Sequence, residues 1–554
     1  MKNRFRSLTL ISSFLLFLFL NADLFSEQIR IGEVTYTLEK TRENDLKRTV
    51  PVDTERIFES EEEFNQYSAD LKQRLLNTRA FDSVEIIIQD NTFSKGESLP
   101  PGLSPETVFD TPPSPEGEAP SNSPRVCAVK IICHDTKSLL ILPYPKYDSN
   151  NGLIFKVKVK DVNFLGTMNP LDIGAFAGLK EDVESGDQNL TLGAEFKYRY
   201  PFYTGNILGS WNNNFEIENT RGVNELEFWS GTGFTFERPF KRFSLLFDFC
   251  EQFNRDLEYE DFDDVQYFTS DLEFSVPIKL FNIENWGGVY WSPFTDAKIN
   301  YDKNGIDSRN DDLAGPVISA GQELSTKRIN WYGNFRTGLS LKAGCSIGYD
   351  FMQNETEPKI YAEAQAFKGF KYIGFNARLS SFLTKSNRGE VGSLIRGVRD
   401  EQKYLNNDGK WLCTKKALKT PSAIVLNIDI PVHIVTTRWL DWLDFIFGEN
   451  SWFSQTFSWT DKFNFELQMS PFLDVALTKN EITDRLFSPK DGWYTGGVEF
   501  LCFPERWKGI VMRASVGVDL GRAVISKKYP GKIDMSWREN VKKYEIYAGI
   551  GLLY

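Results

Sequence analysis

The sequence predicts a β-barrel membrane protein, in which an antiparallel transmembrane barrel follows a small N-terminal α+β domain. Three observations lead to this prediction. The chain begins with a signal-like segment, its long C-terminal region alternates between apolar and polar residues, and 14% of its 554 residues are Phe, Tyr or Trp. A membrane barrel presents an apolar face to lipid, a polar face to its interior, and aromatic girdles to both interfaces.

The first 22 residues have the layout of a secretory signal peptide. Three basic residues lie within the first six positions, and an apolar run from Leu8 to Leu20 follows them. A helix needs roughly 20 apolar residues to span the hydrocarbon of a bilayer. We therefore expect cleavage between Ala22 and Ser26, the alternative being a retained membrane anchor.

The mature chain is expected to be acidic. The formal net charge is -12, and the signal segment carries three Lys or Arg residues and no Asp or Glu, so its removal lowers the charge to -15. A strongly acidic chain is a poor partner for nucleic acid. No later apolar run approaches 18 residues, so no spanning helix is expected beyond the signal.

The six cysteines predict neither a disulfide framework nor a metal site, because their spacing does not repeat. Cys127 and Cys133, with His134 beside them, would lie about 20 Å apart along an extended strand, too far to share a ligand set. We expect no metal and no cofactor. No nucleophile, base and orienting acid are grouped in the sequence, so we do not expect an enzyme.

Residues 27–138 are predicted to form the N-terminal domain. Ile29 to Leu38 and Arg125 to Cys133 are rich in β-branched residues and predict strands, as does Val84 to Ile88. Between them, Ser60 and Glu63 form a possible capping box. The apolar residues Phe64, Tyr67, Leu71 and Leu75 follow at helical spacing.

A proline-rich insertion interrupts this domain at residues 91–124. It holds eight of the 24 prolines of the chain, together with Ser, Gly and Glu. Such a segment cannot bury enough apolar surface to offset its ordering entropy. We expect a disordered insertion at a hairpin tip, the alternative being a docking segment.

Residues 139–554 are predicted to form the barrel. Phe155, Val157 and Val159 alternate with lysines, and the same period of two recurs along the rest of the chain. One face is apolar and the other is often charged, as in a wall between lipid and water. A soluble β-sandwich would alternate over shorter segments with fewer aromatics. Roughly 415 residues can supply about 14 to 18 strands.

Three sequence blocks in the C-terminal half carry a more specific signal. Leu394 to Val398 (LIRGV), Asn427 to Pro431 (NIDIP) and Ser470 to Asp474 (SPFLD) follow in that order. Together they resemble the outer-membrane assembly factors of the BamA and TamA type. The resemblance implies a barrel of about 16 strands. Tyr147 to Leu153 is similar to the family's first strand, and "NFLG" at Asn163 is similar to the turn that follows it. The segment "YRYPFYTGN" at Tyr198 supports the same resemblance.

The N-terminal domain resembles the polypeptide-transport-associated (POTRA) module of that family. The resemblance rests on the helix, the segment "LLNTRAFDSVEI" and the two strands that follow. The module has two helices, and little sequence is available for the first one between Thr41 and Phe58. We therefore expect that first helix to be short or irregular.

The resemblance also implies a loop that folds back into the barrel lumen, with Ile395, Arg396, Gly397 and Val398 as its motif. A buried guanidinium needs a carboxylate partner, preferably through a bidentate pair. We expect Arg396 to pair with Asp474 first and Asp429 second. Gly397 would allow a tight turn, whereas Val398 replaces the usual aromatic residue. The alternative is a surface hairpin with Arg396 in solvent.

The family further implies a seam, the junction of the first and last barrel strands, which opens laterally. We assign Phe155, Val157 and Val159 to its first strand, and Ile546, Gly549, Gly551 and Tyr554 to its last. Glycine weakens a strand, although these glycines could equally make room in a crowded lumen. An aromatic C-terminus is similar to the family's targeting signal, and Tyr554 stands where phenylalanine is usual.

These expectations suggest an outer-membrane protein with its N-terminal domain in the periplasm. It would insert or translocate unfolded outer-membrane clients through the seam, in contact with the lipid bilayer and with periplasmic or lipoprotein partners bound to the POTRA-like domain. The alternatives are a dedicated translocation pore or accessory factor with few clients, and a diffusion porin. A porin would not need the N-terminal domain or the lumen motif.

Overall fold

The computed structural model describes residues 28–90, 124–148, 152–181, 188–221, 226–256, 265–283, 286–306, 313, 315–385, 389–391, 394–397, 402–405, 411–414, 419–449, 451–480, 483–534, 538–540 and 544–552. The signal segment and residues 91–123 of the proline-rich insertion lie outside these ranges. The chain divides into two compact units, Met1–Asp135 and Thr136–Tyr554. No helix in the described part of the chain is long and apolar enough to cross a membrane.

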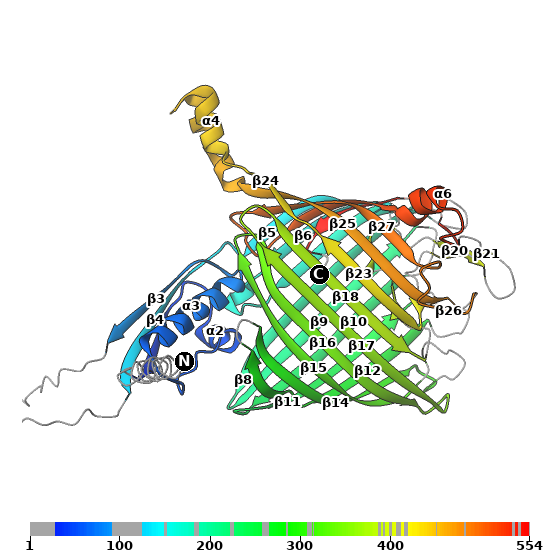
Figure 1. Ribbon diagram of the computed structural model, residues 1–554, viewed down its shortest axis with the longest axis horizontal. Coiled ribbons are helices and arrows are strands. Elements are labelled where there is room, and N and C mark those ends of the chain that lie inside the picture. The colour runs from blue at the N-terminus through cyan, green and yellow to red at the C-terminus, as the bar shows by residue number, and fades with distance from the viewer. Residues whose placement is uncertain are drawn as a thin grey trace, which may run out of the picture. The chain divides into compact units, whose positions relative to one another are not determined.

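The first unit is a four-stranded mixed sheet with two helices. Its elements are β1 (Ile29–Thr37), α2 (Glu43–Thr49), β2 (Ile57–Phe58), α3 (Glu61–Asn77), β3 (Phe81–Asp90) and β4 (Arg125–Asp135). The strand order is β2-β1-β4-β3, with β1 and β4 parallel and the other pairs antiparallel (Figure 1). The seven-residue α2 agrees with the short first helix that the sequence predicts.

Helix α3 forms where the sequence predicts it. The Ser60 hydroxyl accepts a hydrogen bond from the Glu63 N–H at 3.2 Å and so caps the first turn. Phe64, Leu71 and Leu75 are buried on one face of the helix. Phe58 is fully buried, and its ring lies 5.2 Å from that of Phe64, so β2 and α3 share one core.

Strand β4 directs its two cysteines into this core. Cys127 and Cys133 are both buried, and burial raises the pKa of the Cys133 thiol to about 12. The thiol therefore stays protonated and packs as a small apolar group. His134 lies next to Cys133 but pairs with Glu39 at 3.0 Å in an exposed position, so the three side chains are not gathered together.

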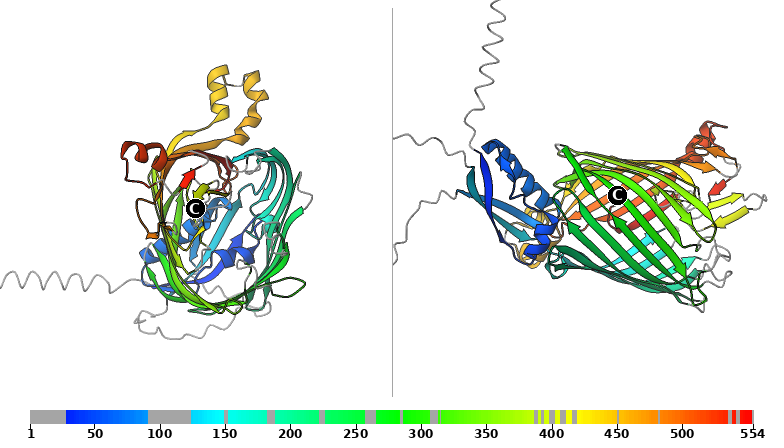
Figure 2. Two further views of the ribbon diagram at one scale, coloured as in Figure 1. Left: turned by 90° about the vertical axis from the view of Figure 1, so that its right-hand side faces the viewer. Right: turned by 90° about the horizontal axis from the view of Figure 1, so that it is seen from below.

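The second unit is an antiparallel β-barrel (Figures 1 and 2). Its wall contains β5 (Leu139–Asp148), β6 (Gly152–Asp161), β7 (Leu171–Glu181), β8 (Gln188–Thr204), β9 (Ile207–Thr220), β10 (Leu226–Pro239), β11 (Ser244–Arg255), β12 (Gln266–Ser275), β13 (Ile278–Ile283), β14 (Gly287–Tyr301), β15 (Val317–Tyr332), β16 (Phe335–Asp350), β17 (Glu355–Gly369), β18 (Gly374–Thr384), β23 (Ser422–Asp429), β24 (Val432–Thr436), β25 (Phe465–Asn480), β26 (Arg485–Leu486), β27 (Trp493–Pro504), β28 (Met512–Asp519) and β30 (Tyr544–Ile550).

The number of strands exceeds the sixteen that the family resemblance implies. Strands β12 and β13 both pair with β14, strands β23 and β24 both pair with β25, and β26 extends the hairpin of β25 and β27. Counting β12 with β13 and β23 with β24 as single strands, and not counting the two-residue β26 separately, leaves eighteen strands among the described residues. This number lies within the range of about 14 to 18 that the length of the region allows.

The two faces of the wall differ in polarity, as the alternation predicts. Phe155 and Val157 on β6 are exposed on the outer face. Lys156 and Lys158, which alternate with them, point to the other face, and Lys156 pairs with Glu195 at 2.5 Å. The outer face is therefore suited to lipid, while the inner face neutralises its charges in pairs.

The two ends of the barrel also differ. At one end, short turns join neighbouring strands, such as the turns at Gly205 and Gly333. One connection at this end is a helical insertion of α4 (Trp439–Phe447), α5 (Trp452–Thr456) and η5 (Ser458–Phe463). Longer connections lie at the other end and contain β19 (Gly389–Glu390), β20 (Gln402–Leu405), β21 (Trp411–Thr414), β22 (Lys419–Thr420), η6 (Gly521–Ile525), α6 (Ser526–Lys528) and β29 (Arg538–Asn540).

We predict that Phe58→Ala lowers the free energy of unfolding of the first unit by about 3 to 5 kcal/mol, because the substitution leaves a cavity beneath α3. Amide hydrogen exchange of β1 and β4 in the full chain measures this change. The control is Ile57→Ala, since Ile57 is 46% exposed, and it should cost less than about 1 kcal/mol. Equal effects of both substitutions would contradict the position of Phe58 in the core.

Candidate functional site: an arginine clasp inside the barrel

The lumen loop, which we define as residues 385–421 between β18 and β23, reaches the inner face of the wall at Leu394–Gly397. Arg396 is only 4% exposed, so the alternative of a surface hairpin with a solvated arginine is wrong. Its partners alternate with outward-facing residues: Asp474 is fully buried, whereas the adjacent Leu473 is 41% exposed. Because successive strand residues point to opposite faces, Arg396 contacts the inner face.

The structure brings Arg396 together with both carboxylates named from the sequence. The guanidinium donates to Asp474 through Nε to Oδ2 at 2.9 Å and through Nη2 to Oδ1 at 2.7 Å, which is a bidentate pair. The backbone N–H of Arg396 donates to the same Oδ2 at 2.9 Å. Nη1 donates to Asp429 at 2.7 Å. The loop is thereby fastened to β25 and β23, and we call this arrangement the arginine clasp.

Two further residues of the clasp are not identifiable from the sequence motifs. Glu499 on β27 approaches Nη1 of Arg396 at 3.8 Å, and the guanidinium carbon lies 3.7 Å from the centroid of the Phe472 ring. A cation over an aromatic face is stabilised most when it is desolvated. Phe472 lies inside the SPFLD block, but only its position on the inward face of β25 could have suggested this contact.

Gly397 lies where a side chain could not. Its φ angle is +87°, and a Cβ atom would lie 2.9 Å from the backbone nitrogen of Val518 and 3.0 Å from the carbonyl carbon of Gly517. Its N–H donates to the carboxylate of Glu545 on β30. Glycine thus allows the loop to lie directly on β28 and to reach the last strand.

Ile395 supplies the apolar part of the contact. It is 2% exposed and belongs to a cluster that also contains Val391, Ala423, Val425, Ala476 and Trp493. Next to it, the carbonyl of Leu394 accepts a hydrogen bond from the Asn427 side chain at 2.8 Å. Val398, the fourth residue of the predicted motif, lies outside the described residues.

Among the described residues, β30 and β5 are joined by one residue pair, Tyr547 with Asp148. By contrast, β28 and β30 pair over seven positions, and β5 and β6 over ten. The junction of β5 and β30 is therefore the weakly paired seam of the wall.

The residues assigned to the first strand of the seam were placed incorrectly. Phe155, Val157 and Val159 lie on β6, which is fully paired with β5 and β7, so they are one strand away from the junction. Strand β5 is the first strand of the barrel. The sequence prediction does not assign its residues to the seam, because Pro143 and Pro145 interrupt the alternation of apolar and polar residues along it. Proline has no N–H to donate and is tolerated on edge strands, which agrees with the sparse pairing of β5 with β30.

The last strand is β30, as predicted, with one correction at its end. Ile546 and Gly549 pair with Val516 and Arg513 of β28. Gly551 is not part of the strand, because β30 ends at Ile550 and the φ angle of Gly551 is +108°. Tyr554 lies outside the described residues.

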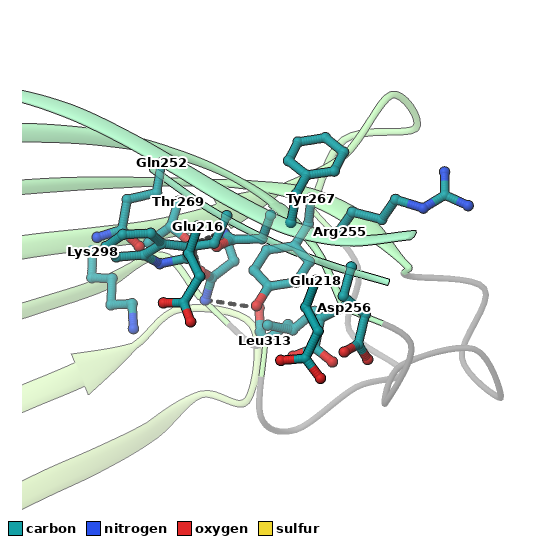
Figure 3. Close-up of a pocket in the computed structure, with 14 residues that line it drawn as sticks. Glu216, Glu218, Gln252, Arg255, Asp256, Tyr267, Thr269, Lys298 and Leu313 are labelled. Carbon is teal, nitrogen blue, oxygen red and sulfur yellow. Dashed lines mark hydrogen bonds between the residues drawn. The ribbon is translucent and has the colours of Figure 1, made fainter. Parts of the chain in front are cut away.

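A polar hollow near the long-connection end is a second candidate site (Figure 3). It has a volume of about 540 Å³ and is lined by β9 to β12, β14 and Leu313. Thr269 and Asn300 form a hydrogen bond of 2.8 Å at its floor, and the Asn300 amide donates to the Leu313 carbonyl at 3.4 Å. Carboxylates and one lysine surround this network, as expected for a water-filled barrel interior.

No family model and no curated protein sequence matches the chain. Among solved structures, it is similar to BamA from Haemophilus ducreyi lacking POTRA domains 1-3, with 10% identity, a TM-score of 0.36, and coverage of 94% of this chain and 85% of that chain. CdiB from Acinetobacter baumannii is 9% identical, with a TM-score of 0.41 and coverage of 94% and 73%. CdiB from Escherichia coli is 9% identical, with a TM-score of 0.42 and coverage of 94% and 76%.

We predict that Arg396→Ala and Asp474→Ala each destabilise the barrel by about 3 to 5 kcal/mol, because each leaves the other charge buried without its partner. The double variant should lose much less than the sum of the two losses. The effect is measured as the midpoint temperature at which the electrophoretic mobility of the barrel changes from the folded to the unfolded form. The control is Lys385→Ala, which breaks an exposed ion pair with Glu355 and should change stability by less than about 1 kcal/mol. Additive losses from the two clasp variants would rule out direct pairing.

We also predict that Gly397→Ala costs about 1 to 3 kcal/mol more than Gly333→Ala. Both glycines have a positive φ angle, so both substitutions strain the backbone, but a Cβ atom at Gly333 would meet nothing within 4 Å. The extra cost at Gly397 comes from the clash with β28. Urea unfolding of both variants in the same detergent gives the difference, and equal costs would show that the loop does not lie on β28.

Proposed function

We propose that this protein resides in the outer membrane and inserts or translocates client proteins through the seam between β5 and β30. The observation that carries the proposal is that the described residues form a single pair at this junction, whereas the neighbouring strands pair over seven to ten positions. The resemblance of the LIRGV, NIDIP and SPFLD blocks to outer-membrane assembly factors supports the same role.

A weakly paired seam offers two strand edges to a client. Unpaired backbone N–H and C=O groups along an edge are a template on which another strand can form. Backbone pairing of this kind accepts many sequences, while the side-chain pockets give the specificity. A client strand could therefore extend the wall at β30 or at β5 without any covalent chemistry.

The arginine clasp would keep one side of the seam in place while the other moves. Arg396 holds β23 and β25, and Gly397 contacts β28 and hydrogen-bonds to Glu545 of β30. Among the described contacts, β5 is bonded mainly to β6. Opening would then move β5 and its neighbours away from a C-terminal wall that the lumen loop supports.

The first unit would act as a POTRA-like periplasmic domain. Its two helices between β1 and β3, the first of them short, support this proposal, because the sequence resemblance implies a module with two helices. Strand β3 pairs with β4 on one side and with no described strand on the other. Its free edge could bind an extended client or a periplasmic or lipoprotein partner by β-augmentation.

A diffusion porin is less well supported, because Leu394–Gly397 of the lumen loop, with the buried Arg396, lies against the inner face of β23 to β28.

Depletion of the protein, followed by quantitative proteomics of the outer membrane, distinguishes a general assembly factor from a dedicated one. We expect broad loss of barrel proteins. Loss of only one or two proteins would indicate a dedicated factor, and an unchanged proteome would contradict both roles.

The seam itself is tested with cysteines at Asp148 and Tyr547 in the full chain. We expect Asp148→Cys/Tyr547→Cys to form a disulfide that reduces client insertion at least tenfold, with recovery after reduction. The matched control is Val157→Cys/Ile546→Cys, which should not crosslink, because β5 lies between β6 and β30. Full insertion activity in the locked form would exclude lateral opening.

A further inference from the structure

The helical insertion between β24 and β25 has an unusually exposed apolar surface. We infer that this segment, residues 438–464, lies in the lipid headgroup region of the leaflet at the short-turn end of the barrel. It contains α4, α5 and η5, and we call it the rim hairpin. The inference rests on the proposed membrane position of the barrel and adds a lipid-binding element that the assembly role does not require.

The large apolar side chains of the rim hairpin are mostly exposed, although some of their rings stack on one another. No residue of α4 or η5 is buried, and Ser454 is the only buried residue of α5. Phe445 is 90% exposed, Trp452 68% and Ile446 66%. Exposed apolar surface of this extent marks a binding site for a protein or a membrane.

The rim hairpin is nevertheless ordered by hydrogen bonds where it joins the barrel and by contacts between its helices. The N–H of Trp439 donates to the Asn464 side chain at 3.0 Å, and its indole N–H donates to the Phe463 carbonyl at 3.2 Å. The Ser451 hydroxyl caps α5 by accepting from the Ser454 N–H at 3.1 Å. The Phe447 and Phe453 rings stack at 4.7 Å and join the two helices. A nine-residue helix is only marginally stable in water by itself, so a partner for its apolar face is expected.

The polar and apolar residues of α4, WLDWLDFIF, are arranged as in a helix that lies at a membrane interface. Asp441 and Asp444 lie three residues apart and share one face, while the rest of the circumference is Trp, Leu, Phe and Ile. Interfacial helices combine a narrow polar face with Trp, Phe and Leu on the other. Residues 438–464 contain two basic and four acidic residues, so apolar burial rather than attraction to anionic headgroups would drive binding.

The rim hairpin continues the aromatic girdle of the barrel. At the same short-turn end, Tyr332, Phe370 and Tyr372 are each more than half exposed. The Tyr372 ring lies 5.8 Å from that of His433 in β24, and the Phe463 ring lies 6.4 Å from that of Trp507 in the turn between β27 and β28. Trp and Tyr in such girdles lie at the level of the headgroups.

The direction of the hairpin favours lipid over a partner in the lumen. Seen along the barrel, α4 and α5 project outward from the wall rather than across its opening (Figure 2). In the side view, α4 leaves the same end of the barrel as β24 and extends away from the wall (Figure 1). With the barrel in a bilayer, an element that leaves the wall outward at the girdle enters the interface of that leaflet.

The test uses the full chain in phosphatidylcholine bilayers, with the six native cysteines replaced by alanine and heat-modifiable mobility retained. An environment-sensitive fluorophore is attached at Phe445→Cys. Ile360→Cys on the outer wall of β17 serves as the lipid control, and Lys303→Cys in an exposed turn at the other end serves as the aqueous control. Because Phe445 is 90% exposed, its replacement removes no packing.

We expect the probe at position 445 to be quenched at least twofold by lipids brominated near the headgroup. It should also be at least threefold less accessible to aqueous iodide than the probe at position 303. If position 360 responds to brominated lipid and position 445 does not, the hairpin inference fails while the barrel stands. If position 360 also fails to respond, the proposed membrane barrel fails with it. Protection from iodide without quenching by lipid, together with a disulfide between two copies of the unlabelled Phe445→Cys protein, would assign the surface to self-association and overturn the inference.

Discussion

The interaction on which the C-terminal half of the barrel depends is the burial of one positive charge. A guanidinium removed from bulk water is costly unless carboxylates meet it with good geometry. Here Asp474 receives two guanidinium hydrogen bonds and the backbone N–H of Arg396, and Asp429 receives a third guanidinium bond. These three groups come from a loop and two strands far apart in the sequence, so satisfying the charge also fixes where the loop lies on the wall.

The position of the loop then determines what the last strands can do. With Arg396 held by β23 and β25, Gly397 is pressed against Gly517 of β28 at a distance that excludes a side chain on either residue. Its N–H reaches Glu545 on β30. The last strand is therefore supported from inside the barrel and by β28, whereas its junction with β5 has one residue pair within the part of the chain that the structure describes. The asymmetry of the seam follows from the clasp on one side and from two prolines on the other.

A second constraint comes from the two solvents that the wall separates. Along β6, lysines point inward and find carboxylates on β7 and β8, while Phe155 and Val157 point outward. The same division explains the rim hairpin, whose aromatic side chains remain largely exposed. Exposure of the Phe445 side chain is unfavourable in water and favourable at a lipid interface. The stability of the rim hairpin therefore depends on the medium around it more than on contacts with the rest of the chain.

The alternating barrel wall and α3 with its Ser60 cap could be predicted from the sequence, since periodicity and capping are local. The pairing of Arg396 with Asp474 and Asp429 could be predicted from the motifs that carry the family resemblance. The strand count, the contacts of Phe472, Glu499 and Glu545, and the extent of the first strand became clear only in the folded chain. Most of β5 could not be assigned from the sequence, because Pro143 and Pro145 interrupt its alternating pattern. Its place in the wall is seen only from its pairing with β6 and β30. Glu499 and Glu545 could not be chosen from the sequence, because alternation assigns a side chain to a face of the wall but does not say which loop will cover it.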